Sequence, residues 1–314
     1  MTPAHHQPSR PLSLLDLGSL LFLGAVWGGA FLFLRIASPE VGPVWAAEIR
    51  LAVGAVTLAV VAGRRTLEVA RGRLIAFMVV GTTFAAVPFS LVAYATLTLP
   101  TGFAALLNAS TPLFTAVLGG VVLGQHLQLR AVAGLGVGVL AVVVLVGWSP
   151  LDAGHGTLLA VLAALGAAAS YATAGTYVRA RMRGVGGVEL ATGMLVAGAL
   201  VTLPVAIVGG APGTVSIGGA VSLVAVGVVS TAVAWPVFFR VLAHTTPTAA
   251  STVTFLVPAF ATAWGALALA EPVGPELIAG FTLVMVSLVL VLGIRPPLPA
   301  IVARRAARLV RAAA

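Results

Sequence analysis

One long apolar stretch with a proline near its middle occurs twice in this chain of 314 residues. The first copy, Pro100–Gln125, reads PTGFAALLNASTPLFTAVLGGVVLGQ, and the second, Pro247–Glu271, reads PTAASTVTFLVPAFATAWGALALAE. Each copy is long enough to cross a bilayer as a helix. An internal proline removes one backbone hydrogen bond, and lipid offers no substitute donor. Two matching broken helices, one in each half, are typical of the binding site of a transporter.

The prolines of these stretches predict where a ligand would be held. Pro112 and Pro258 free the carbonyls of Asn108 and Thr254, which must then face protein, water or a ligand. Asn108 and Thr254 lie on the same helix face as their prolines, with Ser251 on the stripe of Thr254. Single hydroxyls in membrane helices commonly bond their own backbone, whereas Asn108 is the only asparagine in the chain. We expect Asn108 to bind substrate, and Ser251 and Thr254 are candidates for which a bond to their own backbone is the alternative.

Composition indicates an integral membrane protein. The chain is 60% hydrophobic and 8% charged, whereas soluble domains carry about 25% charged residues. Ten runs approach the roughly 20 residues that a helical span needs. We predict an all-α protein with ten transmembrane helices: 15–36, 43–62, 74–95, 100–123, 130–147, 156–178, 188–208, 218–241, 247–269 and 275–293. Residues 1–14 and 295–314 are predicted to be cytoplasmic tails, the second of them basic.

The arginines predict the orientation of the chain. All 17 basic residues are arginines, and 15 of them fall in the two tails and in alternate loops between the predicted spans. The remaining two, Arg35 and Arg50, lie at the end of a span and within one. Cytoplasmic loops are enriched in Lys and Arg, so both termini are expected in the cytoplasm. The prediction is a multi-pass protein of the inner (plasma) membrane.

The ten spans divide into two predicted repeats, 15–147 and 156–294. A shift of 144 residues aligns Trp27 with Tyr171 and Arg35 with Arg179, and a shift of 148 aligns the prolines of the third and eighth spans. Because five is odd, the second repeat must enter the membrane from the opposite side. Inverted repeats are related by a pseudo-two-fold axis in the membrane plane.

These marks together resemble the ten-helix EamA-type exporters of the drug/metabolite transporter superfamily. The resemblance covers residues 15–294 and rests on the following residues: Trp27, Gly28, Arg50, Pro112, Gly134, Pro258, Glu271 and Gly280. Gln125 departs from the glutamate that such proteins usually have. The resemblance implies a central cavity lined by the first, third and fourth helices of each repeat. It also implies that the fifth helices lie at the periphery or in a dimer contact.

Three ionisable residues lie in or near the first two spans, and each has two interpretations. Arg35 and Glu48 are expected at similar depth, so a structural ion pair is one interpretation. Alternatively, Glu48 couples transport to protons, or Arg50 holds a substrate carboxylate. Glu48 and Arg50 are about 200° apart around a helix and cannot both face one cavity.

Aromatic residues and prolines complete the candidate set. The aromatic candidates for substrate contact all lie within spans: Trp27, Tyr94, Tyr171, Trp235 and Trp264. Packing is the ordinary role of such rings, and the repeat-related pair Trp27 and Tyr171 is the one most expected to contact substrate. The predicted helix breaks are Pro88, Pro112, Pro236 and Pro258.

The sequence favours a secondary transporter over other classes of membrane protein. It contains no cysteine, no lysine, no HExxH and no Gly-x-Ser-x-Gly, and no histidine lies within a predicted span. We therefore expect no enzyme activity, cofactor, metal or nucleic-acid partner. The expected function is export of small metabolites, amino acids or amphipathic, drug-like compounds by alternating access. A polytopic membrane enzyme and a subunit that needs a partner chain are the alternatives, and a monomer and a homodimer are both open.

Overall fold

The structure is a bundle of apolar helices. The computed structural model describes residues 13–62, 72–123, 128–148, 154–244 and 253–292. Within these ranges nine helices are long and apolar enough to cross a membrane, and α14 (Val253–Leu269) is a shorter apolar helix. No strand occurs in the described part of the chain. The predicted all-α membrane fold is confirmed.

The first five spans contain one helix broken in the middle and one with an irregular turn. We count a span as one crossing of the bundle, whether it is one helix or several. Their elements are α1 (Leu14–Val41), α2 (Pro43–Ala62), α4 (Leu74–Gly81), η1 (Thr82–Ala86), α5 (Val87–Ala95), α6 (Thr101–Asn108), α7 (Thr111–Leu123) and α8 (Leu129–Trp148). The third span comprises α4, η1 and α5, and the fourth comprises α6 and α7.

The last five spans repeat this order with one difference. Their elements are α9 (His155–Arg181), α10 (Gly187–Val208), α11 (Ile217–Gly227), η2 (Val228–Val233), α12 (Ala234–His244), α14 and α15 (Pro275–Leu292). The eighth span comprises α11, η2 and α12, which matches the third. The ninth span is α14 alone within the described residues, whereas the fourth span is broken.

The first helix is longer than its apolar run predicts. Ser13 caps it, with a capping box to Asp16, and the helix passes Pro39 before it ends at Gly42. Gly42 has φ 82°, a conformation that glycine adopts readily because it has no Cβ. A polar cap and a glycine stop therefore set these ends, and neither signal is part of the hydropathy pattern.

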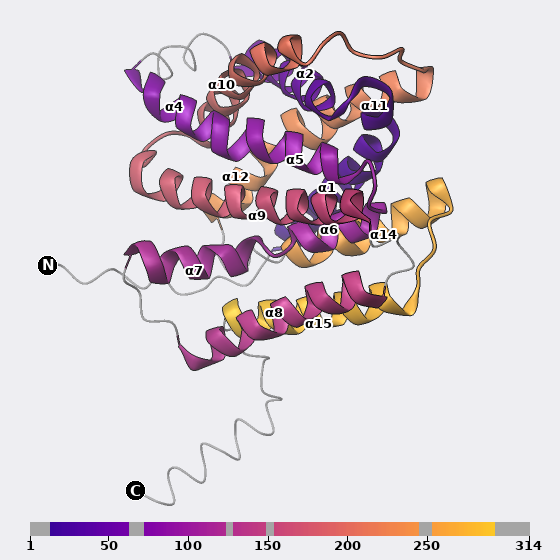
Figure 1. The fold of residues 1–314 in the computed structure, drawn as a ribbon. Helices are drawn as coiled ribbons and strands as arrows, with labels where there is room; N and C mark the ends of the chain where they lie inside the picture. Colours follow the sequence, from indigo (N-terminus) through magenta and orange to yellow (C-terminus); the bar gives the residue numbers. More distant parts are fainter. Residues whose placement is uncertain (1–12, 63–71, 124–127, 149–153, 245–252, 293–314) are drawn as a thin grey trace, which may run out of the picture.

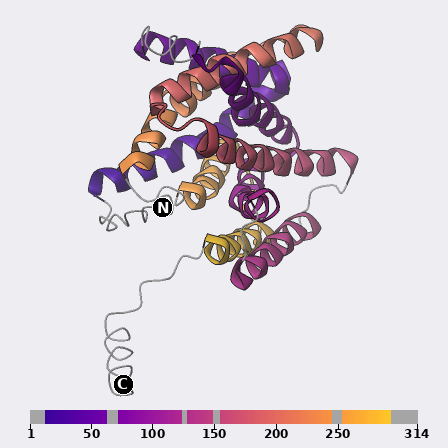
Figure 2. The ribbon, with the colours of Figure 1, turned by 90° about the vertical axis from the view of Figure 1, so that its left-hand side faces the viewer.

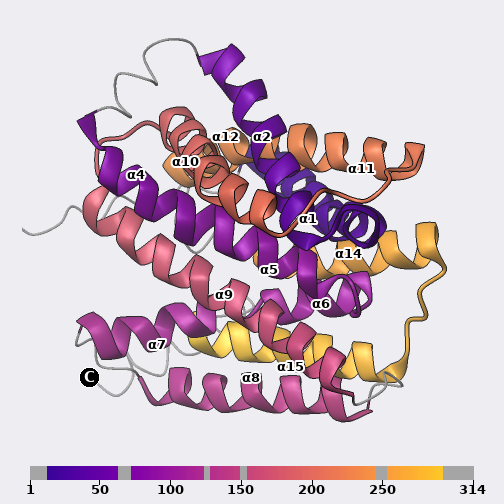
Figure 3. The same cartoon turned by 45° about the horizontal axis from the view of Figure 1, so that its top comes forward.

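The two halves pack against each other along their whole length. The first span of each half lies against the fourth span of the other: α1 against α14, and α9 against α6 and α7. The second spans α2 and α10 pair in the same way. Figures 1 and 3 show α5, α9 and α7 lying side by side. No half forms a separate domain with its own core.

The fifth spans form a pair of their own. α8 and α15 pack on each other, and Figure 2 shows this pair at one edge of the bundle. Ser287 donates a hydrogen bond of 2.6 Å to the carbonyl of Gly134. A methyl group on Gly134 would lie 2.8–2.9 Å from Val291, Leu290 and Ser287. The predicted peripheral position of the fifth helices fits this packing.

Glycines reveal the pseudo-symmetry at atomic level. A Cβ added to Gly54 of α2 would lie 3.3 Å from the carbonyl oxygen of Gly227 in the eighth span. A Cβ added to Gly198 of α10 would lie 3.2 Å from the carbonyl oxygen of Gly81 in the third span. Gly54 and Gly198 are related by the same shift of 144 residues as Trp27 and Tyr171. Each half thus makes the same close contact with the other.

The prediction of two matching broken helices is wrong in the second half. The fourth span ends one helix at Asn108 and begins the next at Thr111. In contrast, α14 runs through Pro258 as one α-helix. Its Val257–Ala261 stretch lies directly against the backbone of Gly28 in α1, so tertiary packing holds the helix on both sides of the proline.

Candidate functional site

The third and eighth spans widen into π-helical turns just before a proline. η1 precedes Pro88 and η2 precedes Pro236. In η1 the N–H of Val87 donates to the carbonyl of Thr82, five residues earlier. In that register Pro88 would have donated to Thr83, and it has no N–H to give. Pro88 and Pro236 were predicted to break their helices. Each instead follows a wide π turn in a helix that continues.

Each wide turn is completed by a side chain from the other half. Ser170 of α9 donates a hydrogen bond of 2.6 Å to the carbonyl of Thr83. Trp27 of α1 donates its indole N–H to the carbonyl of Ser230 at 3.1 Å. Ser230 in turn donates to the carbonyl of Val26 at 2.9 Å. These bonds place the two halves in register near the middle of the bundle.

An aromatic cluster surrounds these turns and joins three of the predicted site residues. We define the aromatic cluster as Trp27, Phe84, Tyr171, Trp235, Phe238 and Phe239. Trp235 lies at its centre, with ring centroids 5.3 Å from Trp27 and 5.1 Å from Phe84. Phe84 then meets Tyr171 at 5.7 Å, edge to face. The cluster thus links the first and third spans of both halves.

Trp235 brings an unused donor into this cluster. Its side chain is 6% exposed, and its indole N–H has no hydrogen-bond partner among the described residues. A buried indole N–H usually finds a partner, because leaving it unpaired costs about 1–3 kcal/mol. The cluster therefore contains an apolar surface with one free donor, which suits a ligand that has an apolar body and an acceptor.

Arg50 is buried in the middle of α2 and contacts both irregular spans. Its Nε donates to the hydroxyl of Thr231 in η2 at 2.9 Å. Its guanidinium carbon lies 3.6 Å from the ring centroid of Phe89 in α5. No carboxylate pairs with Arg50 among the described residues, so a ring face and a hydroxyl are its protein partners. A buried cation with unused N–H groups can receive one anionic group.

The break in the fourth span supplies a second polar position. The carbonyl of Asn108, freed by Pro112, accepts a hydrogen bond of 2.9 Å from the hydroxyl of Thr111. The prediction that this carbonyl requires a partner other than lipid is confirmed. The side-chain oxygen of Asn108 is buried and has no partner within the described chain. This buried side-chain oxygen is therefore an acceptor that a ligand could use.

Glu48 is the buried carboxylate of α2. Its side chain is 6% exposed, and its Oε2 has no hydrogen-bond partner in the described ranges. It lies two residues from Arg50, on a different face of α2, as the helical geometry predicts. Its predicted coupling role stays a prediction.

Arg35 pairs with a different carboxylate from the one predicted. Its Nε lies 3.6 Å from Oε1 of Glu271, which follows α14, so the predicted pair with Glu48 is wrong. The Nη1 of Arg35 also donates to the carbonyls of Thr96 and Leu97 at 2.8 Å each. The carbonyls at the C-terminal end of the third span and the carboxylate of Glu271 are therefore the partners of Arg35.

Glu271 also holds the beginning of the fourth span. It accepts hydrogen bonds from the backbone N–H of Thr101 at 2.8 Å and from its hydroxyl at 3.1 Å. Thr101 is the first residue of α6, where backbone N–H groups have no partner within the helix. Arg35, Glu271 and Thr101 therefore tie the first, fourth and ninth spans together at one end of the bundle.

The remaining predicted residues are dispersed. Trp264 donates its indole N–H to the carbonyl of Ala25 at 2.9 Å and stacks on Phe260. Tyr94 is half-buried against the core, and Thr254 is half-buried in α14. Ser251 lies outside the described residues. Trp264 fastens α14 to α1, which is a packing role.

Sequence reasoning missed the partners of the central residues. Thr231, Ser170 and Ser230 each complete a contact at the wide turns. A signal for them existed, because the shift of 148 that aligns the prolines also aligns Thr82 and Thr83 with Ser230 and Thr231. Two hydroxyl residues therefore precede the proline at matching positions in each half. This pattern indicates where the irregular turns lie.

Comparisons with known proteins agree with this architecture. A solved crystal structure superimposes with a TM-score of 0.61 at 17% identity, covering 91% of this chain and 98% of that one, which shows a shared fold. Protein PagO of Salmonella typhimurium strain LT2 is 28% identical over 127 residues. That match spans 39% of this chain and 42% of PagO. The EamA-like transporter family model matches residues 17–147 and again residues 158–293. The chain therefore belongs to the EamA-like transporter family of the drug/metabolite transporter superfamily, whose members are membrane transporters of small molecules.

Proposed function

We propose that this protein is a secondary transporter that exports small amphipathic metabolites, such as amino acids or drug-like compounds, by alternating access. The observation that carries the proposal is the symmetric contact between the halves at mid-span. Ser170 completes the wide turn of the third span, and Trp27 completes that of the eighth. Two near-equivalent halves that meet at mid-span can exchange conformations, which opens the site to one side and then to the other.

The substrate class follows from the side chains near these turns. Arg50 supplies one buried positive charge with unused N–H groups, and the aromatic cluster supplies apolar rings. No second cation accompanies Arg50 among the charges that the structure describes as buried. A molecule with one carboxylate and an apolar body fits this set, whereas a doubly anionic sugar phosphate would leave one charge unpaired in a buried site.

Uptake into proteoliposomes tests the proposal. The wild type would be supplied with a mixed pool of amino acids and metabolites, with and without a pH gradient, beside Asn108→Ala and Arg50→Met. We expect selective flux that falls at least tenfold in both variants, because each loses a buried polar group that binds substrate. Thr282→Ala is the matched control, since its exposed hydroxyl bonds only its own helix on α15.

The outcomes separate the proposal from its alternatives. Flux unchanged in Asn108→Ala and Arg50→Met would move the binding site elsewhere in the bundle. Equal loss in Thr282→Ala would assign the effect to folding. If no compound is transported by wild type, a membrane enzyme or a subunit that needs a partner chain becomes the better explanation.

Glu48 is proposed to couple transport to protons, since its buried Oε2 lacks a hydrogen-bond partner among the described residues. Glu48→Gln keeps the size of the side chain and removes its exchangeable proton. We expect this variant to lose accumulation driven by a pH gradient and to keep exchange of labelled for unlabelled substrate. Undiminished proton-driven accumulation in Glu48→Gln would overturn the assignment.

A further inference from the structure

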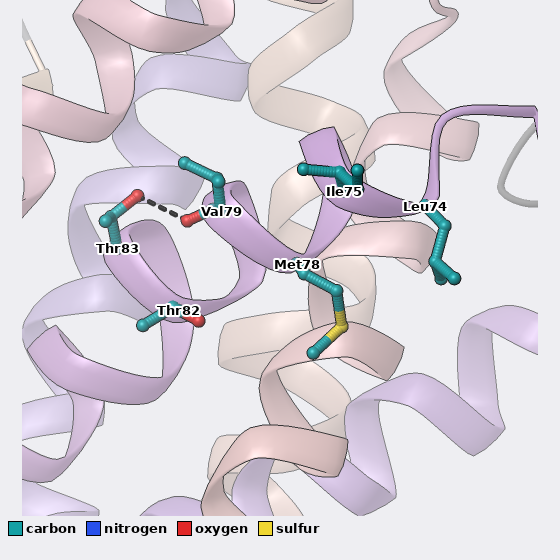
Figure 4. A pocket seen from close by; sticks show the side chains of 6 residues that line it. All are labelled: Leu74, Ile75, Met78, Val79, Thr82 and Thr83. Carbon is teal, nitrogen blue, oxygen red and sulfur yellow. Dashed lines mark hydrogen bonds between the residues drawn. The ribbon is translucent and has the colours of Figure 1, made fainter.

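A shallow apolar groove lies on the exposed face of the third span. Its volume is about 440 Å³, and it is lined by Leu74, Ile75, Met78, Val79, Thr82 and Thr83. Figure 4 shows the hydroxyl of Thr83 turned back to the carbonyl of Val79, at 2.7 Å. Leu74 is 61% and Ile75 is 80% exposed. In a membrane-spanning helix such a face contacts lipid, so the groove is open to acyl chains.

The length of the groove matches one leaflet. Leu74 to Thr83 is ten residues of nearly continuous helix, or about 15 Å at 1.5 Å per residue. The hydrocarbon core of a bilayer is about 30 Å thick, so half of it is about 15 Å. The groove begins at the end of the span and reaches the wide turn η1 near its middle.

Exposed arginines gather where the groove begins. Arg73 directly precedes Leu74, and its Nη1 donates to the carbonyls of Arg181 and Arg183 at the end of α9, at 3.5 and 3.4 Å. Arg183 donates from Nε to the carbonyl of Arg179 at 3.1 Å. Figure 1 shows the start of α4 and the end of α9 at the same side of the bundle. Four exposed arginines, Arg73, Arg179, Arg181 and Arg183, thus lie at the end of the bundle where the groove begins.

Most of the donors of this basic group remain free. Each guanidinium has five N–H groups, and the described bonds use one nitrogen each of Arg73, Arg179 and Arg183. Glu189 in the first turn of α10 places its carboxylate against Gly186, in the turn that follows α9. One carboxylate beside four arginines leaves this corner positively charged.

We propose that this corner is a binding site for one anionic phospholipid. The phosphate group is attracted to the positively charged corner that carries Arg73, Arg179, Arg181 and Arg183, and one acyl chain lies in the groove between Leu74 and Thr83. Basic residues at the end of a span attract anionic headgroups. Arginines alone would be explained by the orientation of the protein in the membrane. An apolar groove as long as one leaflet, next to these arginines, can also bind an acyl chain.

Native mass spectrometry of the full-length protein tests this site. The protein would be extracted from vesicles of equal parts palmitoyl-oleoyl phosphatidylglycerol and phosphatidylcholine, and retained lipid would be counted. Wild type should retain phosphatidylglycerol selectively. Arg179→Gln/Arg181→Gln should reduce retention by about fivefold for each charge removed, while Arg73 keeps its bonds to the end of α9. Val79→Trp fills the groove and should abolish retention with every arginine in place.

A matched control and a competitor decide the result. Arg130 is an exposed arginine in the first turn of α8, away from the groove. Equal loss in Arg130→Gln would show diffuse attraction to the basic face and overturn the proposal, as would equal retention of phosphatidylcholine. Displacement of the lipid by millimolar sn-glycerol 3-phosphate would show a phosphate site without a chain site and would also overturn it. Unchanged melting temperatures confirm that the variants fold.

Discussion

The fourth and ninth spans have the same sequence signature and different structures. Both contain a proline near mid-span, yet the fourth breaks between Asn108 and Thr111, and α14 continues through Pro258. The proline marks a missing backbone hydrogen bond in each case. The neighbouring helix decides whether the chain breaks there.

The neighbouring helices differ in a way that the repeat alignment exposes. α1 presents Gly24 and Gly28 to α14, and a Cβ on Gly28 would lie 2.8 Å from the backbone nitrogen of Ala261. The shift that aligns Trp27 with Tyr171 places the buried Ala168 and Ala172 of α9 at the matching positions. At the matching positions α9 therefore carries two buried methyl groups where α1 carries two glycines. Close backbone packing stabilises the continuous helix.

The largest expected effect comes from closing this glycine face. Gly28→Val should lower the free energy of unfolding by about 3 kcal/mol, because its Cβ meets backbone that cannot move aside. Thermal unfolding in detergent, followed by circular dichroism, measures the loss. Gly18→Val on the same helix is the control, since nothing lies within 4 Å of its Cβ. If both variants lost the same free energy of unfolding, close packing could not explain why the fourth span breaks and the ninth does not.

Removing the link between the two compared spans should have the next largest effect. Glu271→Ala takes away the acceptor at the start of α6 and the partner of Arg35. We expect a loss of about 2 kcal/mol in unfolding free energy. Glu276→Ala, in the first turn of α15, should cost less than about 1 kcal/mol. A double-mutant cycle with Arg35→Gln measures how much of the loss belongs to the ion pair, and additive losses would show that there is none.

Replacing the two prolines should have opposite effects. Pro258→Ala supplies a donor within a continuous helix and should stabilise the protein by about 1–2 kcal/mol. Pro112 is the second residue of α7, where its missing N–H is not needed. Pro112→Ala should therefore change stability by less than about 0.5 kcal/mol. Stabilisation of the same size in both variants would contradict this explanation. It would mean that the break in the fourth span does not remove the cost of the missing N–H of Pro112.

The smallest effect tests the cap at the break. Thr111→Val leaves the carbonyl of Asn108 without its donor and should cost about 1 kcal/mol. Thr115→Val, on the same helix, removes a hydroxyl bonded to the carbonyl of Thr111 and should cost less, because such a bond is local to an intact helix. Hydrogen exchange at Ala109 and Ser110 should rise only in the first variant.

Hydropathy and repeats sufficed to predict the helical fold, because lipid requires every spanning backbone to be hydrogen-bonded within itself. The positions of the spans along the chain follow from that constraint, whereas their pairing across the halves was not predicted and is given by the structure. The partner of Arg35 did not follow, because depth in the membrane does not specify which face of a helix a side chain occupies. The choice between Glu48 and Glu271 depended on the packing of α1 against α14.

The sequence identified individual candidate residues, but it did not predict which of them contact one another. Trp27, Tyr171 and Trp235 were recognisable as aromatics within spans, and the structure joins them through Phe84. The wide turns were not predicted, since a proline is compatible with a break, a kink or a π turn. The carbonyl of Thr83, which Pro88 cannot pair, receives its donor from Ser170 in the other half, and that partner cannot be read from the proline.

The bonds across the halves also set the timing of assembly during synthesis. Trp27 meets its acceptor 203 residues later in the chain, Arg50 meets Thr231 after 181 residues, and Thr83 meets Ser170 after 87 residues. At about 5–20 residues per second, a separation of roughly 200 residues takes on the order of 10–40 s to synthesise. During most of that interval Arg50 has not yet met Thr231, whereas the carbonyl of Thr83 waits only for Ser170 in the sixth span. The contacts of Trp27 and Arg50 with the second half can therefore form only after the eighth span has been synthesised.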